Sequence, residues 1–529
     1  MLSTPRAFRG MVTAPHHLAA QAGLRVLRDG GNAIEAMIAA AATIPVVYPH
    51  MNAIGGDGFW IVAEPGKEPI GIDACGAAGA AVTPEFYRSK GHAQIPSRGP
   101  LAANTVAGTV AGWGLAYKIA QRWSGTMPLA RLLEDAIEYA KSGAPVTVSQ
   151  ARFTDEKMSE CLEAPGFAET FLIDGKAPAP GTRFKQPALG ETLTRIAKAG
   201  PEDFYRGELA RKIGADLARA GSPITADDLA RHQAKEVVPL SLRLRCGTAY
   251  NMTPPTQGLA SLLILGLFER CGVTEADGFD YVHALVESTK LAFRMRDRHV
   301  TDPAYMTVTP QALLEAAAID KLWRDFDRKR AAPWPAPPQK GDTIWMGAID
   351  EQGRSASFIQ SIYWEFGSAV VLRDTGILWQ NRGTSFSLDP AAPQALKPGR
   401  KPFHTLNPAL ARLNDGRNVV YGTMGGDGQP QTQAAIFTRY ALFGQSPQQA
   451  VTAPRWLLGR TWGTTVTKLR LESRHPSELV SRLEAAGHEL EVLAPFTDLM
   501  GHAGLIAHHR SGLIEGATDP RGDGAVAAF

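Results

Sequence analysis

The chain has 529 residues, of which 44% are hydrophobic and 20% are charged, and this composition is typical of globular proteins. Its formal net charge is only +3, from 55 basic and 52 acidic residues, so we expect neither a nucleic-acid partner nor a membrane-surface partner. The four cysteines (Cys75, Cys161, Cys246, Cys271) are widely spaced and form no C-x-x-C pair, which argues against a metal site and against a disulfide framework.

The N-terminal segment "MLSTPRAFRGMVTAPHH" has no apolar core of the kind found in signal peptides. No apolar run approaches the ~18–20 residues that are needed to span a membrane. We therefore expect a cytoplasmic protein with reduced thiols.

The N-terminal region is predicted to contain two helices followed by a hairpin. The first helix covers about Leu18–Arg28 and ends at a glycine pair, since glycine accepts the left-handed conformation of a helix C-terminus. Asn32 and Glu35 have the spacing of a capping box, and the helix that they begin is apolar on nearly all sides, which predicts burial. Strands are expected at 59–63 and 69–73.

The middle of the chain is predicted to be mostly helical, and the last third is rich in strands. Expected helices lie at 129–141, 190–199, 209–220, 259–269, 281–294, 431–443 and 476–486, and expected strands at 343–349, 355–363, 369–372, 418–423 and 469–472. Helices that precede strands in this way favour a layered α+β architecture over a Rossmann fold.

A proline-rich run, Ala331–Lys340, leads into Asp342 and Thr343 and is predicted to be exposed and extended. The turn sequence "DEQG" then predicts a hairpin, in which Thr343 lies opposite Gln360 or, with one bulged residue at the turn, opposite Ser361.

The chain could be cut before Thr343, which would make this residue a new N-terminus. An N-terminal threonine carries both a nucleophilic hydroxyl and its own base, because the α-amine titrates near ~7.7–8.0 and takes the hydroxyl proton. The alternative is that Thr343 is an ordinary strand residue, since threonine favours strands.

Two glycine-rich turns, "IGGDGF" (54–59) and "GTMGGDGQ" (422–429), offer backbone N–H groups. Such groups could bind a phosphate or stabilise an oxyanion, or the segments could be tight turns without a ligand. Neither turn matches a nucleotide-binding fingerprint.

An ordered series of segments along the chain resembles the γ-glutamyltranspeptidase family of N-terminal-nucleophile (Ntn) hydrolases. The segments include "GMVTAPHHLAAQAGLRVLRDGGNAIEAMIAAA", "NAIGGDGFWIV", "NTVAGTVAGW", "GPEDFYRGELARKI", "GDTIWMGAIDEQG", "GILWQNRGTSF", "GTMGGDG" and "GATDPR".

The resemblance implies a four-layer αββα sandwich that is built from two subunits made by autocatalytic cleavage between Asp342 and Thr343. Residues 1–342 would form the large (α) subunit, with a proline-rich tail, and residues 343–529 the small (β) subunit. The two would remain interlocked as a heterodimer, and a dimer of these heterodimers is one assembly that the family allows. No cofactor and no metal are expected.

The same resemblance assigns roles to residues that match the family's motifs. Thr343 corresponds to the nucleophile, and Ser361 to a second hydroxyl that holds the nucleophile's amine. Gly425 and Gly426 correspond to the glycine pair whose N–H groups form the oxyanion hole.

The positions with which the family grips the glutamyl group differ in this chain. The arginine for the α-carboxylate is replaced at Cys75 or Gly76, and the aspartate for the α-amine is replaced by Ser385. The other replacements are Tyr363 for an asparagine, Arg382 for a glutamine, and His404 and Thr405 for paired serines. A zwitterionic glutamyl group would be poorly paired in such a site.

These replacements predict a smaller, acidic substrate. Tyr363, Trp345 and Trp364 could narrow the pocket, and Arg382 could bind a carboxylate with two N–H groups or belong to a structural ion pair. The "GDTIW" and "QNRGTSFSLD" segments resemble family members that hydrolyse oxamate to oxalate and ammonia in allantoin (purine) breakdown. The alternatives are a γ-glutamyl hydrolase or transferase acting on glutathione-like substrates and, from a different class, a processed but inactive binding scaffold.

Overall fold

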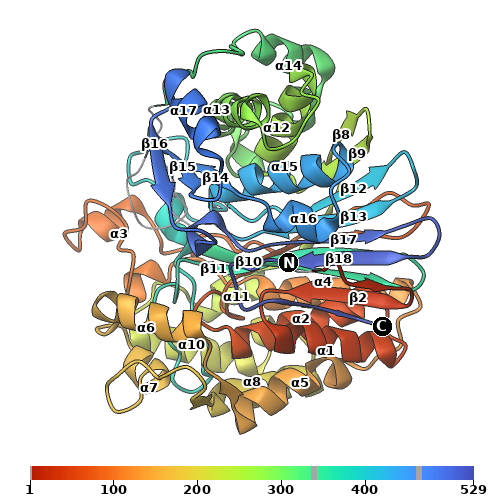
Figure 1. Cartoon of the computed structure of the whole chain (residues 1–529). Helices are drawn as coiled ribbons and strands as arrows, with labels where there is room; N and C mark the ends of the chain where they lie inside the picture. The colour runs from red at the N-terminus through yellow and green to blue at the C-terminus, as the bar shows by residue number, and fades with distance from the viewer. Residues whose placement is uncertain (1–2, 335–341, 460–466) are drawn as a thin grey trace.

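The computed structural model describes residues 3–334, 342–459 and 467–529. Two seven-stranded sheets pack face to face, and helices cover the outer face of each sheet (Figure 1). The predicted αββα layering is therefore confirmed.

All neighbouring strands of the first sheet are antiparallel, and the central pair is the β10–β11 hairpin. In spatial order the strands are β19 (Ala525–Ala528), β2 (Gly10–Ala14), β10 (Asp342–Asp350), β11 (Ser355–Tyr363), β3 (Asp57–Ala63), β4 (Ile70–Asp73) and β7 (Lys235–Val237). The hairpin from the second half of the chain thus lies between strands from its beginning.

The second sheet is also antiparallel throughout. Its order is β1 (Arg6–Ala7), β18 (Ile514–Thr518), β17 (Ala503–His508), β13 (Asn418–Thr423), β12 (Ala409–Leu413), β9 (Gly247–Asn251) and β8 (Leu240–Leu244). Smaller sheets contain β14 (Trp456–Leu458), β15 (Leu469–Glu472) and β16 (Leu490–Leu493), and β5 (Ala144–Pro145) with β6 (Arg183–Phe184).

The Trp345 indole is part of the apolar cluster between the two sheets. Its Nε1 donates a hydrogen bond to the Ser357 hydroxyl at 3.0 Å. A Cβ atom on Gly422 or Gly504 would lie within 2.2 or 2.4 Å of the ring, so both positions require glycine. Trp345 therefore belongs to the inter-sheet core, and the expectation that it narrows a substrate pocket is not met.

The helices that cover the first sheet come from the N-terminal part of the chain. Those in contact with its strands are α1 (His17–Arg28), α2 (Ala33–Val47) and α4 (Thr109–Arg122). α5 (Leu129–Ser142) packs on α2, and α8 (Pro187–Ala199) packs on α5. The other helices of this part of the chain are α3 (Pro84–Arg88), α6 (Val148–Cys161), α7 (Phe167–Phe171), α9 (Asp203–Arg206), α10 (Glu208–Ala220) and α11 (Ala226–Arg231). The predicted capping box of Asn32 and Glu35 begins α2, which is buried along its whole length.

The second helical layer lies on the outer face of the second sheet (Figure 1). It consists of α12 (Gly258–Cys271), α13 (Phe279–His299), α15 (Gly428–Ala441) and α16 (Pro447–Thr452), flanked by α14 (Ala316–Trp323) and α17 (Ser477–Ala485). Among the described residues, no helix combines the length and the apolar character that crossing a membrane requires.

The strand predicted at 369–372 is wrong. Ala369 has a φ of +62°, which breaks an extended strand, and only Val371 forms an isolated bridge, with Leu378. The N–H of Val371 donates to the carbonyl of Pro165 in a loop. The β-branched residues that suggested a strand are instead buried in loop packing.

The proline-rich run was expected to be exposed, but its first residues are anchored. The N–H of Ala331 donates to the Ala486 carbonyl at 2.8 Å, and the N–H of Ala332 donates to the Glu287 carboxylate at 3.0 Å. The Lys290 ammonium donates to the Ala332 carbonyl at 2.6 Å. Residues 335–341 lie outside the described residues.

Candidate active site

Thr343 lies near the start of β10, where the register between β10 and β11 changes. Ile344 pairs with Gln360, whereas Asp342 pairs with Tyr363, so β11 accommodates one extra residue beside Thr343. A bulge of this kind bends a strand and redirects a side chain. Of the two partners that the sequence left open, Gln360 is taken by Ile344, and Thr343 is buried opposite Ser361 and the next residue.

Ser361 places a buried hydroxyl at this bulge. Its Oγ accepts a hydrogen bond from the Tyr363 N–H at 2.8 Å, and Tyr363 has a φ of +85°. On the other side, Ser361 is the cross-strand partner of Asp57 in β3. Residues that pair across neighbouring strands project from the same face, so the bulge brings the Thr343 strand, the Ser361 hydroxyl and the Asp57 carboxylate to one end of the inter-sheet space.

Gly425 and Gly426 form the turn between β13 and α15. Their φ values are +118° and +51°, a region that favours glycine. Within the described ranges, neither N–H donates a hydrogen bond to another group. Two free N–H groups at the entrance to a helix can stabilise a developing negative charge, as an oxyanion hole requires.

The Gln257 side chain fixes the turn that contains Gly425 and Gly426. Its Nε2 donates to the carbonyls of Gly426 at 2.7 Å and Thr405 at 2.9 Å. Arg296 in turn donates to the Gln257 side chain at 2.9 Å and to Asp427 at 2.8 Å, all in a buried setting. The turn and the His404–Thr405 segment are therefore fixed relative to each other.

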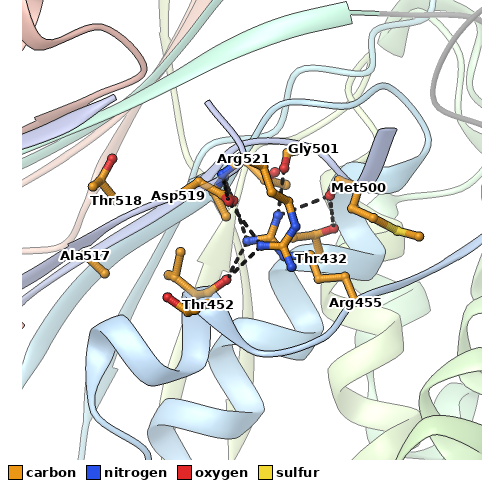
Figure 2. Close-up of polar contacts among 12 residues, drawn as sticks. Thr432, Thr452, Arg455, Met500, Gly501, Ala517, Thr518, Asp519 and Arg521 are labelled. Carbon is orange, nitrogen blue, oxygen red and sulfur yellow. Dashed lines mark hydrogen bonds and ion pairs between the residues drawn. The ribbon is translucent and has the colours of Figure 1, made fainter. Parts of the chain in front are cut away.

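A buried ionic cluster contains Arg455, Asp519 and Arg521, and Figure 2 shows its polar contacts. Arg455 donates to the carbonyls of Met500 and Gly501 at 3.2 and 2.7 Å and pairs with Asp519. Asp519 also pairs with Arg521 at 3.1 Å and accepts the Ala503 N–H at 2.6 Å. The cluster thus fixes the chain just before and at the start of β17.

This chain segment touches the glycine turn directly. The His502 carbonyl accepts a hydrogen bond from the N–H of Met424 at 3.0 Å, and Met424 immediately precedes Gly425. A Cβ on Gly501 would lie 2.4 Å from the Met424 carbonyl oxygen, so the two segments are in close contact. The ionic cluster therefore supports the conformation of the turn that contains Gly425 and Gly426.

Arg382 is fully buried and begins a short 3-10 helix, η4 (Arg382–Ser385). Its Cζ lies 3.8 Å from the centroid of the Tyr363 ring, and Nη1 donates to the Thr405 hydroxyl at 3.4 Å. Its Nε and Nη2 atoms are buried and have no hydrogen-bond partner. Burial lowers the pKa of Arg382 to about 10, so the group remains charged at neutral pH. In the described chain, no carboxylate forms an ion pair with it.

His404 and Asp57 form a second polar element of this region. The His404 Nε2 and an Asp57 carboxylate oxygen lie 2.9 Å apart, and both side chains are fully buried. The other carboxylate oxygen accepts the N–H groups of Gly76 and Gly108 at 2.9 and 3.1 Å. Burial raises the pKa of Asp57 to about 7 and lowers the pKa of His404 well below its ordinary value.

The remaining predicted substrate-binding residues fall around these groups. The half-buried Ser385 hydroxyl donates to the Phe403 carbonyl at 3.4 Å, next to His404. The Trp364 ring faces the Arg98 guanidinium at 5.6 Å. The assignments of these residues stay predictions, but the structure brings Tyr363, Arg382, His404 and Thr405 together.

Two trios of buried side chains bring potential metal ligands within 4.8 Å of one another in the described part of the chain. They are Asp57, Cys75 and His404, and His283, Glu287 and His488. A positive charge already lies beside each trio: Arg382 beside the first, and Lys290, 2.7 Å from Glu287, in the second. This charge disfavours a metal cation, and we assign neither trio as a metal centre.

The sequence analysis did not single out Asp57, Gln257 or Arg296. Asp57 lies in the "IGGDGF" segment, whose glycines predict a turn. An aspartate in an otherwise apolar segment that is expected to be buried predicts a buried polar site, because a buried carboxylate needs hydrogen-bond or charged partners. Gln257 and Arg296 carried no comparable signal.

Comparisons with known proteins agree with this geometry. The family model described as Gamma-glutamyltranspeptidase matches residues 19–529. Oxamate amidohydrolase proenzyme of Klebsiella pneumoniae is 55% identical, with all of both chains covered. A glutathione hydrolase-like proenzyme of Bacillus subtilis is 41% identical over 98% of each chain. Among solved structures, cephalosporin acylase from Bacillus halodurans superimposes with a TM-score of 0.92 at 34% identity, covering 100% of this chain and 97% of that one.

Proposed function

The chain belongs to the γ-glutamyltranspeptidase family, and from this premise we propose that it is a self-processed amidohydrolase that converts oxamate to oxalate and ammonia. The observation that carries the choice of substrate is the buried Arg382, with two unpartnered nitrogens beside the Thr343 bulge. A fork of this kind matches a carboxylate, and oxamate places its carboxylate directly on the scissile carbonyl.

The connection between Arg382 and the nucleophile strand is short. The N–H of Asn381 donates to the Ile362 carbonyl at 3.2 Å, and Ile362 lies in the β11 bulge opposite Thr343. The Arg382 guanidinium then rests on Tyr363, the next residue of β11. A substrate held by Arg382 is therefore confined to the immediate neighbourhood of Thr343, which favours a small acyl group.

Processing is the first step of the proposed mechanism. The Thr343 hydroxyl attacks the Asp342 carbonyl, the C–N bond breaks, and an ester replaces the amide. Water hydrolyses this ester, which leaves an Asp342 carboxylate and a free Thr343 α-amine. The products would be subunits 1–342 and 343–529, which form a heterodimer.

Hydrolysis then uses the new N-terminus. The α-amine takes the Thr343 hydroxyl proton, the oxygen attacks the amide carbonyl, and the N–H groups of Gly425 and Gly426 stabilise the oxyanion. The amine passes the proton to the leaving nitrogen, which departs as ammonia. Water then repeats the attack on the ester and releases oxalate. In this proposal the Ser361 hydroxyl orients the amine.

A γ-glutamyl substrate is the second candidate, because a relative that is 41% identical is named a glutathione hydrolase-like proenzyme. At the position of the family's aspartate, the α-amine of such a substrate would meet the Ser385 hydroxyl, which bonds a backbone carbonyl. Cys75, at the place of the family's arginine, is a buried thiol whose pKa burial raises. Both features support the smaller substrate. An inactive scaffold is the third candidate.

A panel of amides separates these three functions. The purified protein is incubated with oxamate, a γ-glutamyl anilide and unrelated primary amides, and ammonia or aniline release gives kcat/KM for each. We expect oxamate to be preferred by orders of magnitude. A preference for the γ-glutamyl anilide would support the second candidate, and no turnover of any amide would support the scaffold.

A cytoplasmic location and a role in purine breakdown also belong to this proposal. The four cysteines are free, as expected for a reducing compartment.

A further inference from the structure

The Asp57–His404 pair has two possible charge states, and they present different atoms to a ligand. With the carboxylate ionised and the imidazole protonated on Nε2, the pair is an anion and His404 Nδ1 is a lone-pair acceptor. With one more proton the pair is neutral and Nδ1 carries a hydrogen, whether the extra proton is counted on Asp57 or on the imidazole. Nδ1 is buried and has no hydrogen-bond partner in the structure.

The charges around the Asp57–His404 pair determine which protonation state of the pair a bound carboxylate would favour. The charged or titratable groups close to the pair are Arg382, Lys401, Cys75 and Tyr205, and Tyr363 lies against Arg382. Asp73 forms an ion pair with Lys401 at 2.6 Å. When the pair is anionic, its charge and that of the Arg382 cation balance each other. A bound carboxylate adds a further negative charge in a place without solvent, which is costly unless it is compensated.

We propose that the Asp57–His404 pair takes up one proton when a carboxylate binds beside Arg382, and that His404 Nδ1–H then becomes a second donor to that ligand. The inference rests on the proposed carboxylate substrate. The proton comes from solvent, and no covalent bond to carbon, nitrogen or oxygen of the ligand changes. Asp57 and His404 thereby determine specificity for a compact carboxylate, because the pair takes up its proton only when a negative charge binds beside Arg382.

The pH dependence follows from the direction of the pKa shifts. Burial raises the pKa of Asp57 to about 7, against the opposing effect of the Gly76 N–H and of Arg382, so the free pair holds the extra proton at lower pH and loses it above this value. A bound anion raises the proton affinity of the pair further. Carboxylate affinity should therefore be flat in acid and fall by up to about tenfold per pH unit above about pH 7.

The test uses the wild-type protein and oxalate, the product that the proposed function predicts. Isothermal titration calorimetry near pH 8, repeated in buffers of different ionisation enthalpy, counts the protons taken up on binding. The Thr343 α-amine of a processed enzyme can also titrate there, so the informative quantity is the difference between variants.

Asp57→Asn is the decisive variant. The amide oxygen can still accept the two N–H groups of Gly76 and Gly108, and the amide nitrogen donates to His404 Nε2, which fixes the proton on Nδ1. We expect this variant to take up close to one proton less than wild type and to lose the decline in affinity at high pH. Asp73→Asn is the matched control, since Asp73 is a neighbouring buried carboxylate that bonds Lys401 and not His404, and it should keep the wild-type uptake.

Equal proton uptake by wild type and Asp57→Asn would overturn the inference, as would wild-type affinity that stays flat above pH 7 or an absence of saturable oxalate binding. Oxamate hydrolysis is measured separately on the same preparations. Loss of hydrolysis with intact proton-linked binding would count against the proposed reaction alone, whereas hydrolysis without linkage would count against the pair alone.

Discussion

The Arg382 guanidinium stacks on the ring of Tyr363, with Cζ 3.8 Å from the ring centroid. The aromatic face compensates part of the charge of a buried cation while leaving the guanidinium edge free, because stacking uses the plane and hydrogen bonding uses the rim. This pair explains how a fully buried arginine persists in the described structure without an ion-paired carboxylate, and it directs the first two predictions.

Replacing Arg382 with alanine should lower kcat/KM for oxamate roughly ten- to a hundredfold, since a charge-assisted hydrogen bond contributes ~1.5–3 kcal/mol. Arg382→Lys should recover only part of the activity, because an ammonium lacks the planar fork. Steady-state kinetics measure both, and circular dichroism checks folding. A folded, processed Arg382→Ala enzyme with unchanged kcat/KM would contradict the assigned role.

Replacing Tyr363 with leucine should weaken oxamate hydrolysis less than the loss of Arg382 does. A cation–π contact contributes about 0.5–2 kcal/mol, so we expect kcat/KM to fall about two- to thirtyfold. Tyr363→Phe keeps the aromatic face and serves as the control, with activity close to wild type. If the phenylalanine variant lost as much activity as the leucine variant, the phenol hydroxyl would matter and not the stacking.

Thr343→Ala should remain a single chain and be inactive, because both processing and hydrolysis need the hydroxyl. Thr343→Ser keeps a hydroxyl and should be cut at least in part. Denaturing gels and N-terminal sequencing of the smaller fragment detect the cut. Efficient cleavage before residue 343 in the alanine variant would mean that another group or a protease performs it.

Asp519→Asn should destabilise the protein by about 3–5 kcal/mol, since it removes the carboxylate that pairs with the buried Arg455 charge, whereas Arg521 keeps its pair with Glu472. It should also slow hydrolysis through the glycine turn, although Asp519 touches no substrate. Glu491→Gln breaks the more exposed Arg470–Glu491 pair, which has one side chain 38% exposed, and should change stability by at most about 1 kcal/mol. Thermal unfolding and kcat are compared in both variants.

The same aspartate predicts an acid dependence of stability. Burial alone would raise the pKa of Asp519, but the charges of Arg455 and Arg521 lower it below its ordinary value. A carboxylate with a depressed folded-state pKa contributes stability above the unfolded value near ~3.9 and loses it as pH falls through the folded value. The melting temperature of Asp519→Asn should therefore approach that of wild type in acid. A constant difference down to about pH 2 would contradict this linkage.

Local signals predicted much of the fold. The Asn32–Glu35 capping box and the glycine pair before it fixed the boundary between the first two helices, because these contacts are made within one helical turn. The strand at Ser355–Tyr363 was predicted with its observed bounds. The strand prediction at 369–372 was wrong because the backbone of this segment bonds Pro165 and other loop residues, and no local sequence pattern predicts such contacts.

In the candidate site, too, the family resemblance and local patterns predicted some residues, whereas contacts between distant parts of the chain were missed. The resemblance supplied Thr343, Ser361 and the two glycines, and the hairpin register then favoured Ser361 as the neighbour of Thr343. The Asp57–His404 contact joins residues that are 347 positions apart, so spacing could not suggest it. Trp345 was expected to narrow the pocket, but the glycines across the sheet interface accommodate its ring.

The β10–β11 hairpin lies between β2 and β3, and β19 pairs with β2 at the sheet edge. Cleavage before Thr343 would therefore divide each sheet between two polypeptides, neither of which has a complete seven-stranded sheet of its own. While the chain is continuous, the two parts meet at the high effective concentration of one molecule, and afterwards they would meet only by bimolecular collision. The peptide bond at 342–343 would then act as a temporary assembly tether, and once denatured, the separated chains should regain structure slowly and in a concentration-dependent manner.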